Sequence, residues 1–340
     1  MHRLALALSV LAALAPIQSP APVRAEDAPK PLRAGIIGLD TSHVTAFTSV
    51  LNNPRAKPEV AGVRVVAAYP GGSADVESSH SRVAGYTADL KEKFGVEIVD
   101  SIDALLEKVD VVLLESVDGR KHLAQAEPVL KARKPVFIDK PVAGTLADAI
   151  KIFQLAEQYG TPCFSSSSLR YSPSIVALLN NPKVGDIVGC DAFGPCSLEE
   201  HHPDLFWYGV HGVESLFTVM GTGCVSVARV QTEGTELVTG TWEKGRVGTF
   251  RGIRQGKADY GVLAFGTKGV VLGQGYGGYE PLLVEVCRFF RTGKPPVSAK
   301  ETIELFAFME AADESKRRGG APVTLESVLA KARDQAGSSK

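Results

Sequence analysis

The chain is 340 residues long, with 44% hydrophobic and 22% charged residues and a formal net charge of −1. This length is enough for two domains with substantial cores. The near-neutral charge provides no basic field for polyanions, so nucleic acid and anionic membrane surfaces are not expected as partners.

The first residues have the pattern of a secretion signal. Met1-His2-Arg3 is a short basic start, Leu4 to Ile17 is almost unbroken apolar sequence, and Val23-Arg24-Ala25 places small residues before Glu26. This order predicts a Sec-type signal peptide over residues 1–25 and a periplasmic or secreted mature chain, with no membrane association after cleavage. The alternative is an anchor that is retained uncleaved, although the apolar run is short for a bilayer span.

Residues 32–145 alternate between apolar runs and helical spacing, which predicts a Rossmann domain. The apolar runs are too short for anything except central strands of a parallel sheet. Repeated strand–helix–strand order is typical of a doubly wound α/β fold. The expected strands cover 33–38, 63–68, 111–115 and 136–138, and the expected helices cover 43–51, 87–94 and 101–109, the last with Ser101 as N-cap.

Residues 146–325 predict a second, α+β domain built on a mostly antiparallel sheet. A helix over 146–159 and a strand at 162–164 come first, and consecutive strands without intervening helices follow. These strands are expected at 225–231, 237–242, 247–252, 261–265 and 269–273, and closing helices at 280–292 and 299–317. The last helices can pack back on the first domain, and residues 326–340 are expected to be a polar tail.

The stretch GIIGLDTSHV, residues 35–44, resembles the phosphate turn of a dinucleotide-binding domain. Gly38 keeps the first glycine, whereas Asp40 and His43 stand at the other two glycine positions. The helix that follows offers free N–H groups, and Thr41 and Ser42 add hydroxyls, so a weakened phosphate site is expected here. We expect Asp40 to turn away from the phosphates and to cap this helix.

Three motifs occur in order along the chain. Asp139-Lys140-Pro141 ends a strand, Gly209 to Glu214 reads GVHGVE, and Ala311 to Thr324 reads AADESKRRGGAPVT. Together they resemble the glucose–fructose oxidoreductase/inositol dehydrogenase (Gfo/Idh/MocA) family. The resemblance implies hydride transfer between NAD or NADP and a sugar, polyol or related carbohydrate. It also implies a homo-oligomer through the C-terminal sheet.

The resemblance places Lys140 between nicotinamide and substrate, and His211 as the acid or base on the reacting hydroxyl. Histidine has a suitable intrinsic pKa for this proton transfer. The alternative for Lys140 is a solvated lysine at a strand end. The alternative for His211 is a core histidine whose hydrogen bonds are made within the protein. The complete set of expected cofactor-binding residues is Gly38, Asp40, Thr41, Ser42, His43, Asp118, His122 and Lys140.

The chain also departs from the family pattern. Trp207 replaces the aspartate expected four residues before His211, and Asp204 is either its catalytic substitute on the same helical face or an N-cap. The second strand ends in Tyr69-Pro70 without an acid, so the choice between NAD and NADP stays open. Expected substrate-binding residues are Arg170, Tyr171, His202, Trp207, Tyr208 and Glu214, with interdomain packing as the alternative for the Arg170-Tyr171 pair.

A metal site is not expected in HHPDLFWYGVH, residues 201–211, because no H-x-H or H-x-x-x-H pair occurs there. The leading hypothesis is therefore an exported oxidoreductase acting on a carbohydrate. A second is a carbohydrate-binding relative that has lost its cofactor and its catalysis. A third is a glycoside hydrolase that uses tightly held NAD for transient oxidation.

Overall fold

The structure is a computed structural model that describes residues 30–338. The expected signal peptide, residues 1–25, lies outside the described residues. In the part of the chain that is described, no helix is both long enough and apolar enough to cross a membrane.

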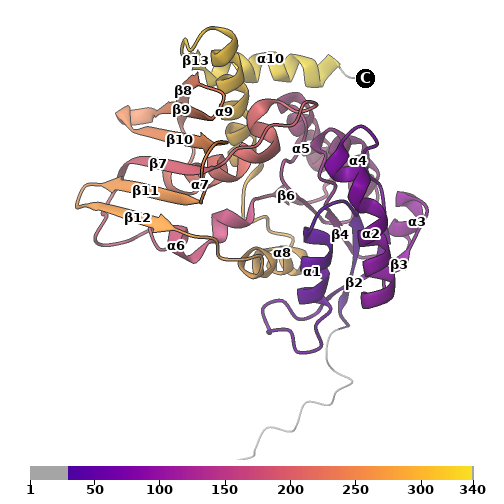
Figure 1. The fold of residues 1–340 in the computed structure, drawn as a ribbon. Helices are drawn as coiled ribbons and strands as arrows, with labels where there is room; N and C mark the ends of the chain where they lie inside the picture. Colours follow the sequence, from indigo (N-terminus) through magenta and orange to yellow (C-terminus); the bar gives the residue numbers. More distant parts are fainter. Residues whose placement is uncertain (1–29, 339–340) are drawn as a thin grey trace, which may run out of the picture. The chain divides into compact units, whose positions relative to one another are not determined.

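The first sheet is parallel and has six strands in the order β3-β2-β1-β4-β5-β6 (Figure 1). Its strands are β1 (Leu32–Ile37), β2 (Val63–Tyr69), β3 (Glu97–Ile98), β4 (Val111–Leu114), β5 (Val136–Ile138) and β6 (Cys163–Ser165). β4 and β5 are buried along their whole length, which explains their short, uniformly apolar sequences. The order reverses between β1 and β4, and ligands of doubly wound folds bind at this point of the sheet.

The helices of the first domain fill the crossovers between these strands. They are α1 (His43–Leu51), α2 (Glu77–Phe94), α3 (Ile102–Leu106), α4 (His122–Lys131) and α5 (Leu146–Tyr159). Ser101 caps α3 as predicted, because its hydroxyl accepts from the backbone N–H of Ala104 at 3.1 Å. α2 begins at Glu77 rather than at residue 87, and strand β6 extends the first domain past the expected boundary at residue 145.

The second sheet is mixed and has seven strands in the order β12-β11-β7-β10-β9-β8-β13. Its strands are β7 (Ile187–Pro195), β8 (Cys224–Gln231), β9 (Thr235–Trp242), β10 (Val247–Ile253), β11 (Gly261–Gly266), β12 (Val270–Gln274) and β13 (Val323–Thr324). Only β7 and β10 pair in parallel; the other neighbours are antiparallel, as predicted. The sequence reading missed β7, where Gly189 and Gly194 interrupt the apolar alternation.

The remaining helices pack on the second sheet or return to the first domain (Figure 1). They are α6 (Pro173–Val176), α7 (Val210–Met220), α8 (Glu280–Thr292), α9 (Ala299–Arg317) and α10 (Leu325–Ser338). α7 contacts β7 and β10, and α9 contacts β8. α8 belongs to the first domain's core, where Phe289 meets Phe164 edge to face with ring centroids 4.9 Å apart.

The expectation of a polar tail over residues 326–340 was wrong, because α10 occupies most of this stretch. Its buried residues Leu325, Val328, Ala332 and Ala336 recur every three or four positions and form one helical face. This face contacts α5 and α9. One hydrophobic cluster therefore runs from β4 and β5 through α5 and α9 to α7, so the two domains share a core.

Candidate active site

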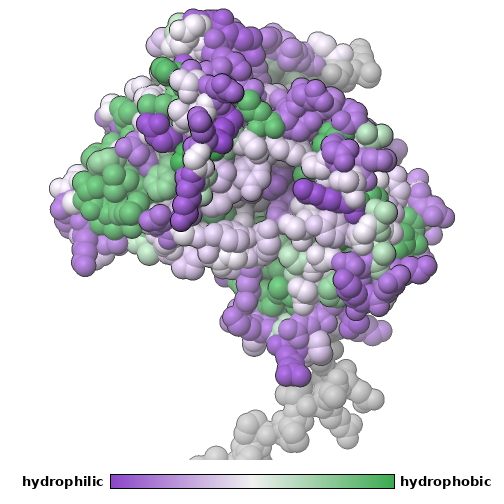
Figure 2. Space-filling model, viewed as in Figure 1, coloured by the Kyte–Doolittle hydropathy of each residue, from purple (hydrophilic) through white to green (hydrophobic). Residues whose placement is uncertain are grey.

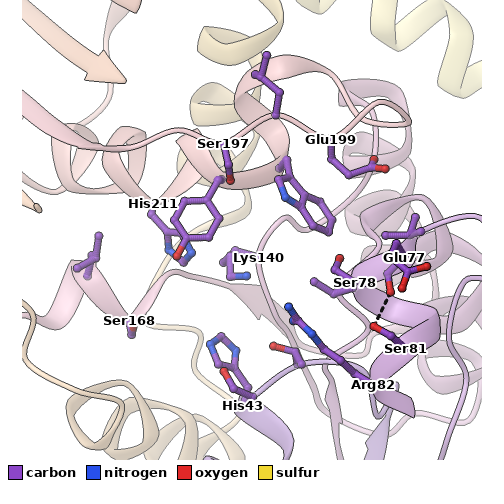
Figure 3. A pocket seen from close by; sticks show the side chains of 18 of the residues that line it. His43, Glu77, Ser78, Ser81, Arg82, Lys140, Ser168, Ser197, Glu199 and His211 are labelled. Atoms are coloured by element: carbon purple, nitrogen blue, oxygen red, sulfur yellow. Dashed lines mark hydrogen bonds between the residues drawn. The ribbon is translucent and has the colours of Figure 1, made fainter. Parts of the chain in front are cut away.

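A cleft of about 1010 Å³ lies between the carboxyl ends of the first sheet and the second domain (Figure 3). Its walls are polar and aromatic. From the first domain it is lined by Thr41, Ser42, His43, Asp75, Val76, Glu77, Ser78, Ser81, Arg82, Val117 and Lys140. From the rest of the chain it is lined by Ser168, Leu169, Ser197, Leu198, Glu199, Glu200, Trp207, Tyr208, His211, Tyr260, Tyr276 and Tyr279.

Lys140 reaches the cleft from the loop that follows β5, as predicted. The residue before it, Asp139, is buried, and its Oδ1 accepts the backbone N–H of Lys140 at 2.8 Å. Lys140 therefore stands on a fixed piece of backbone at the carboxyl edge of the sheet, so its ammonium group can approach a ligand oxygen there.

His211 reaches the same cleft from α7, so the structure brings together the two residues expected to be catalytic. Its Nδ1 lies 2.7 Å from the hydroxyl oxygen of Ser167, which fixes the ring. Burial and the charge of Lys140 hold the pKa of His211 well below its usual range. The lowered pKa favours the neutral ring, which is the form that can accept a proton.

A π-helical turn over Leu205–Gly209 precedes α7 and places Trp207 and Tyr208 in the cleft. π-turns inside helices are frequently found at functional sites. The ring of Tyr208 lies against His211 with centroids 5.2 Å apart. Both residues therefore line the cleft, and their role as stacking surfaces for a carbohydrate stays a prediction.

Asp204 is placed elsewhere, and both interpretations of it were wrong. Its Oδ2 lies 2.7 Å from Nη2 of Arg229 and 2.6 Å from Nζ of Lys316. It makes no side-chain capping bond to the turn that follows. Because this carboxylate is held by two cations outside the cleft lining, it is not a catalytic partner of His211.

Arg170 and Glu214 form an ion pair that joins segments rather than lining the cleft. Nε of Arg170 lies 2.5 Å from Glu214, and its Nη2 lies 2.7 Å from Glu301 on α9. Tyr171 is likewise absent from the cleft lining and packs against the core of the first domain. The structure therefore agrees with interdomain packing as the role of the Arg170-Tyr171 pair. Glu214 takes part in this packing through its ion pair with Arg170.

His202 also lies behind the cleft rather than in it. Its Nδ1 lies 2.6 Å from Glu199 and its Nε2 lies 3.0 Å from Asp118, so the ring is sandwiched between carboxylates of the two domains. The ring also packs on Trp207, with centroids 4.8 Å apart. His202 supports a cleft residue and does not contact the ligand space itself.

The phosphate turn keeps its tight bend at Gly38, where φ is +90° and an added Cβ would lie 2.2 Å from the hydroxyl oxygen of Ser116. Asp40 is fully buried, accepting from the N–H of Val117 at 2.9 Å and from the hydroxyl of Ser79 at 2.6 Å. The expectation that Asp40 turns away from the phosphates is correct, but the expectation that it caps α1 is wrong. Burial raises the pKa of Asp40.

Asp118 and His122 are buried behind the turn and do not line the cleft, contrary to their expected contact with a cofactor. Nε2 of His122 lies 2.7 Å from the carbonyl oxygen of Ser116, and burial lowers the pKa of this histidine. Asp118 accepts from the hydroxyl of Ser73 at 2.6 Å and from Arg120. Both residues stabilise the loop after β4 through these buried hydrogen bonds.

The sequence reading missed a face of α2 and a group of tyrosines. Ser78, Ser81 and Arg82 face the cleft from the first turns of α2 (Figure 3). Their spacing of three and four residues marks one helical face, but the helix was expected to start after them. Tyr276 and Tyr279, also three residues apart, stand on glycine-rich sequence that gave no periodic signal.

The doubly wound sheet, its switch point and a cleft shared with a second sheet are the architecture of a dinucleotide-binding α/β fold joined to a second domain. Residues 32–167 match the family model described as an oxidoreductase family with an NAD-binding Rossmann fold. This match to the Gfo/Idh/MocA model covers the first domain, which is similar to the NAD-binding Rossmann domains of that family.

A curated relative matches part of the chain. The chain is 30% identical over 165 residues to inositol 2-dehydrogenase 1 of Saccharopolyspora erythraea. The aligned region covers 46% of this chain and 44% of that protein. The chain thus matches less than half of the length of this curated relative.

Solved structures share the fold across both domains. The apo scyllo-inositol dehydrogenase of Lactobacillus casei has a TM-score of 0.71 at 15% identity, over 87% of this chain and 99% of that chain. An Agrobacterium radiobacter oxidoreductase in complex with NAD+, L-tartaric acid and magnesium has a TM-score of 0.70 at 16% identity, over the same fractions.

The turn is compatible with a bound dinucleotide despite its two missing glycines. The Asp40 side chain points into the protein, where its partners hold it. The His43 imidazole is held by Asp139 at 2.6 Å. The first turn of α1 therefore still borders the cleft at the positive end of the helix, where Thr41 is in the lining and Ser42 is exposed to a ligand phosphate.

Proposed function

We propose that the chain is an NAD- or NADP-dependent oxidoreductase that oxidises or reduces a hydroxyl-bearing carbon of a sugar, polyol or related carbohydrate. The observation that carries this proposal is the meeting of Lys140 and His211, from different domains, in one cleft at the carboxyl edge of the first sheet. The names of the relatives support the substrate class, since two of them are inositol dehydrogenases.

The chain's own residues would handle the proton of this reaction. When bound, the nicotinamide ring supplies the acceptor or donor of the hydride. His211 accepts the hydroxyl proton on Nε2, because Nδ1 is engaged with Ser167. The Lys140 ammonium group orients the same oxygen, and the rings of Trp207 and Tyr208 provide apolar surfaces for a carbohydrate ring.

Two measurements test this proposal in sequence. Calorimetric titration of the purified chain with NAD and with NADP is expected to show binding of at least one. A panel of polyols and sugars, including myo-inositol, is then expected to give reduced nicotinamide with at least one of them. Absence of binding to both dinucleotides would contradict the proposal.

Replacing Asp40 with glycine is expected to weaken dinucleotide binding, even though it restores the usual turn sequence. The substitution leaves the N–H of Val117 and the hydroxyl of Ser79 without their buried acceptor, at about 1–3 kcal/mol for each group. The loop after β4 and the start of α2 then lose their common attachment to the turn. Calorimetric affinity and thermal denaturation measure both effects.

Asp40→Asn is the matched control for this prediction. Its amide oxygen still accepts from Val117, and its amide nitrogen can donate to Ser79 after rotation of that hydroxyl. We therefore expect a milder loss than in Asp40→Gly. Tighter binding in the glycine variant would show that the carboxylate harms the site instead of organising it.

We also propose that the chain is exported, on the basis of the basic, apolar and small-residue order of residues 1–25. The expected mature N-terminus is Glu26. N-terminal sequencing of protein recovered from the producing cell, separated into periplasmic and cytosolic fractions, checks this. Protein that starts at Met1 and stays in the cytosol would refute export.

A homo-oligomer through the second sheet is proposed from exposed apolar side chains on that sheet. Val188, Val270 and Leu272 are roughly half exposed. Figure 2 shows an apolar area over the outer ends of β7, β11 and β12. Light scattering of the purified chain measures the assembly, and a monomer at micromolar concentration would contradict it.

A further inference from the structure

His43 occupies the third glycine position of the phosphate turn, and the proposed reaction does not use its side chain. It is the first residue of α1, its side chain is 9% exposed, and it lines the cleft. The ring stacks on Phe47 with centroids 5.0 Å apart and meets the edge of Tyr279 at 4.7 Å. The imidazole is therefore held in one orientation at the ligand space.

A buried carboxylate fixes which nitrogen of His43 faces a ligand. Burial alone would raise the pKa of Asp139, but the charge of Lys140 and the hydrogen bonds from His43 and the Lys140 backbone lower it below the ordinary range, which favours the ionised carboxylate. An ionised carboxylate can only accept hydrogen bonds. Nδ1 of His43 therefore carries a proton and donates a hydrogen bond to Oδ2 of Asp139, 2.6 Å away. Nε2 carries the lone pair and has no protein partner within residues 30–338.

The cleft therefore contains two imidazoles that have different hydrogen-bond partners. In Figure 3, His211 lies to the left of Lys140 and His43 lies below it. His211 is supported by the neutral hydroxyl of Ser167, whereas His43 is supported by a carboxylate. A carboxylate partner stabilises the imidazolium that forms when histidine takes a proton. His43 is thus the imidazole better arranged to remove a proton from a weak acid.

We propose that His43, oriented by Asp139, is a second catalytic base of the cleft and removes the proton from a carbon adjacent to a ligand's carbonyl group. The ligand class is an α-hydroxyketone, open-chain or cyclic. This inference rests on the proposed function in one respect, namely that oxidation of a polyol hydroxyl would create such a ketone in the same cleft.

The step is balanced without any further oxidant or reductant. The C–H bond breaks, and its proton goes to Nε2 of His43. Its electron pair forms the carbon–carbon double bond of an enolate, while the carbonyl π electrons move to the oxygen. The Lys140 ammonium group stabilises that oxygen. Return of a proton from Nε2 restores the ketone, so the observable result is exchange of a carbon-bound hydrogen with solvent.

The test is hydrogen–deuterium exchange into 2-keto-myo-inositol, followed by NMR in D₂O with the full chain and no added nicotinamide. The wild-type chain is expected to exchange the hydrogens next to the carbonyl faster than buffer does. His43→Gln and Asp139→Asn are each expected to slow the enzymatic exchange by about 100-fold or more. His80→Gln, which changes an exposed histidine on α2, is expected to exchange at the wild-type rate.

Exchange no faster than in buffer would overturn the inference. So would exchange that persists in His43→Gln but is lost in His211→Asn, because the base would then be His211. Thermal denaturation shows whether the variants fold. If Asp139→Asn does not fold, the comparison of His43→Gln with the wild-type chain still tests the inference. Binding and reduction of a nicotinamide dinucleotide without exchange would refute this inference alone, whereas exchange without dinucleotide binding would refute only the proposed function.

Discussion

Replacing His211 with asparagine is expected to lower kcat by roughly two to four decades, the usual contribution of a positioned acid–base group. Asparagine can still bond Ser167 in place of Nδ1, but it offers no nitrogen at the position of Nε2. The fold should survive because no large apolar volume is emptied. Initial-rate kinetics on the substrate found in the polyol panel, together with thermal denaturation, separate a chemical defect from unfolding.

Lys140→Met is expected to lower kcat by a similar factor and also to move the pH profile. The charge of Lys140 is one of the causes that lower the pKa of His211. Without this charge, His211 is protonated at higher pH, so the acid limb of kcat/KM should shift upward. Unchanged turnover in both variants would exclude this pair as the catalytic centre. An unshifted limb in a slow Lys140→Met enzyme would argue that Lys140 acts without electrostatic contact with His211.

Replacing Arg229 with methionine is expected to cost about 3–5 kcal/mol of the free energy of unfolding, because it breaks a buried charge cluster from one side. The side chain of Arg229 is 0% exposed, and Nη1 lies 2.5 Å from Asp313 while Nη2 contacts Asp204 and Glu236. Methionine has a similar length but no charge, so buried carboxylates lose their common partner. Urea denaturation at neutral pH measures the loss.

The loss of unfolding free energy in Arg229→Met should be smaller at acid pH. Burial already raises the pKa of Asp313 to about 7, against the opposing charge of Arg229. Without Arg229 this pKa rises further, so the folded variant binds more protons than the unfolded chain and gains stability as pH falls toward about 5. Arg288→Met is the matched control, since Arg288 is 64% exposed in its ion pair with Glu285 and its loss should cost under about 1 kcal/mol. Equal losses in the two variants would show that burial of the cluster contributes nothing.

The sequence predicted most elements of the fold because their patterns are local. The short apolar strands β4 and β5 and the amphipathic helix α5 depend on residues within one segment. The errors fall where the local signal is diluted. α10 has only four buried side chains in a polar stretch, and the first turns of α2 are rich in serine, so neither gave a clear apolar face.

The site could be predicted only where a motif carried it. Lys140 and His211 were identified from two motifs, and the structure brings them together. Asp204 was misassigned for two reasons. The π-helical turn after it breaks the α-helical spacing to His211, and its cationic partners, Arg229 and Lys316, are distant in sequence. Partners so distant in sequence leave no local pattern, and for the same reason the sequence could not show that Ser79 and Val117 are the partners of Asp40.

The shared core of the two domains restricts how a ligand can enter the cleft. Because one apolar cluster continues from β5 through α5 and α9 to α7, a rigid-body hinge between the domains would have to tear it open. Polar contacts near the cleft join segments differently: Asp75 contacts Arg120 at 2.9 Å at the surface, and the buried Asp118 contacts His202 at 3.0 Å behind the cleft. We therefore expect a ligand to enter and leave the cleft without separation of the two domains.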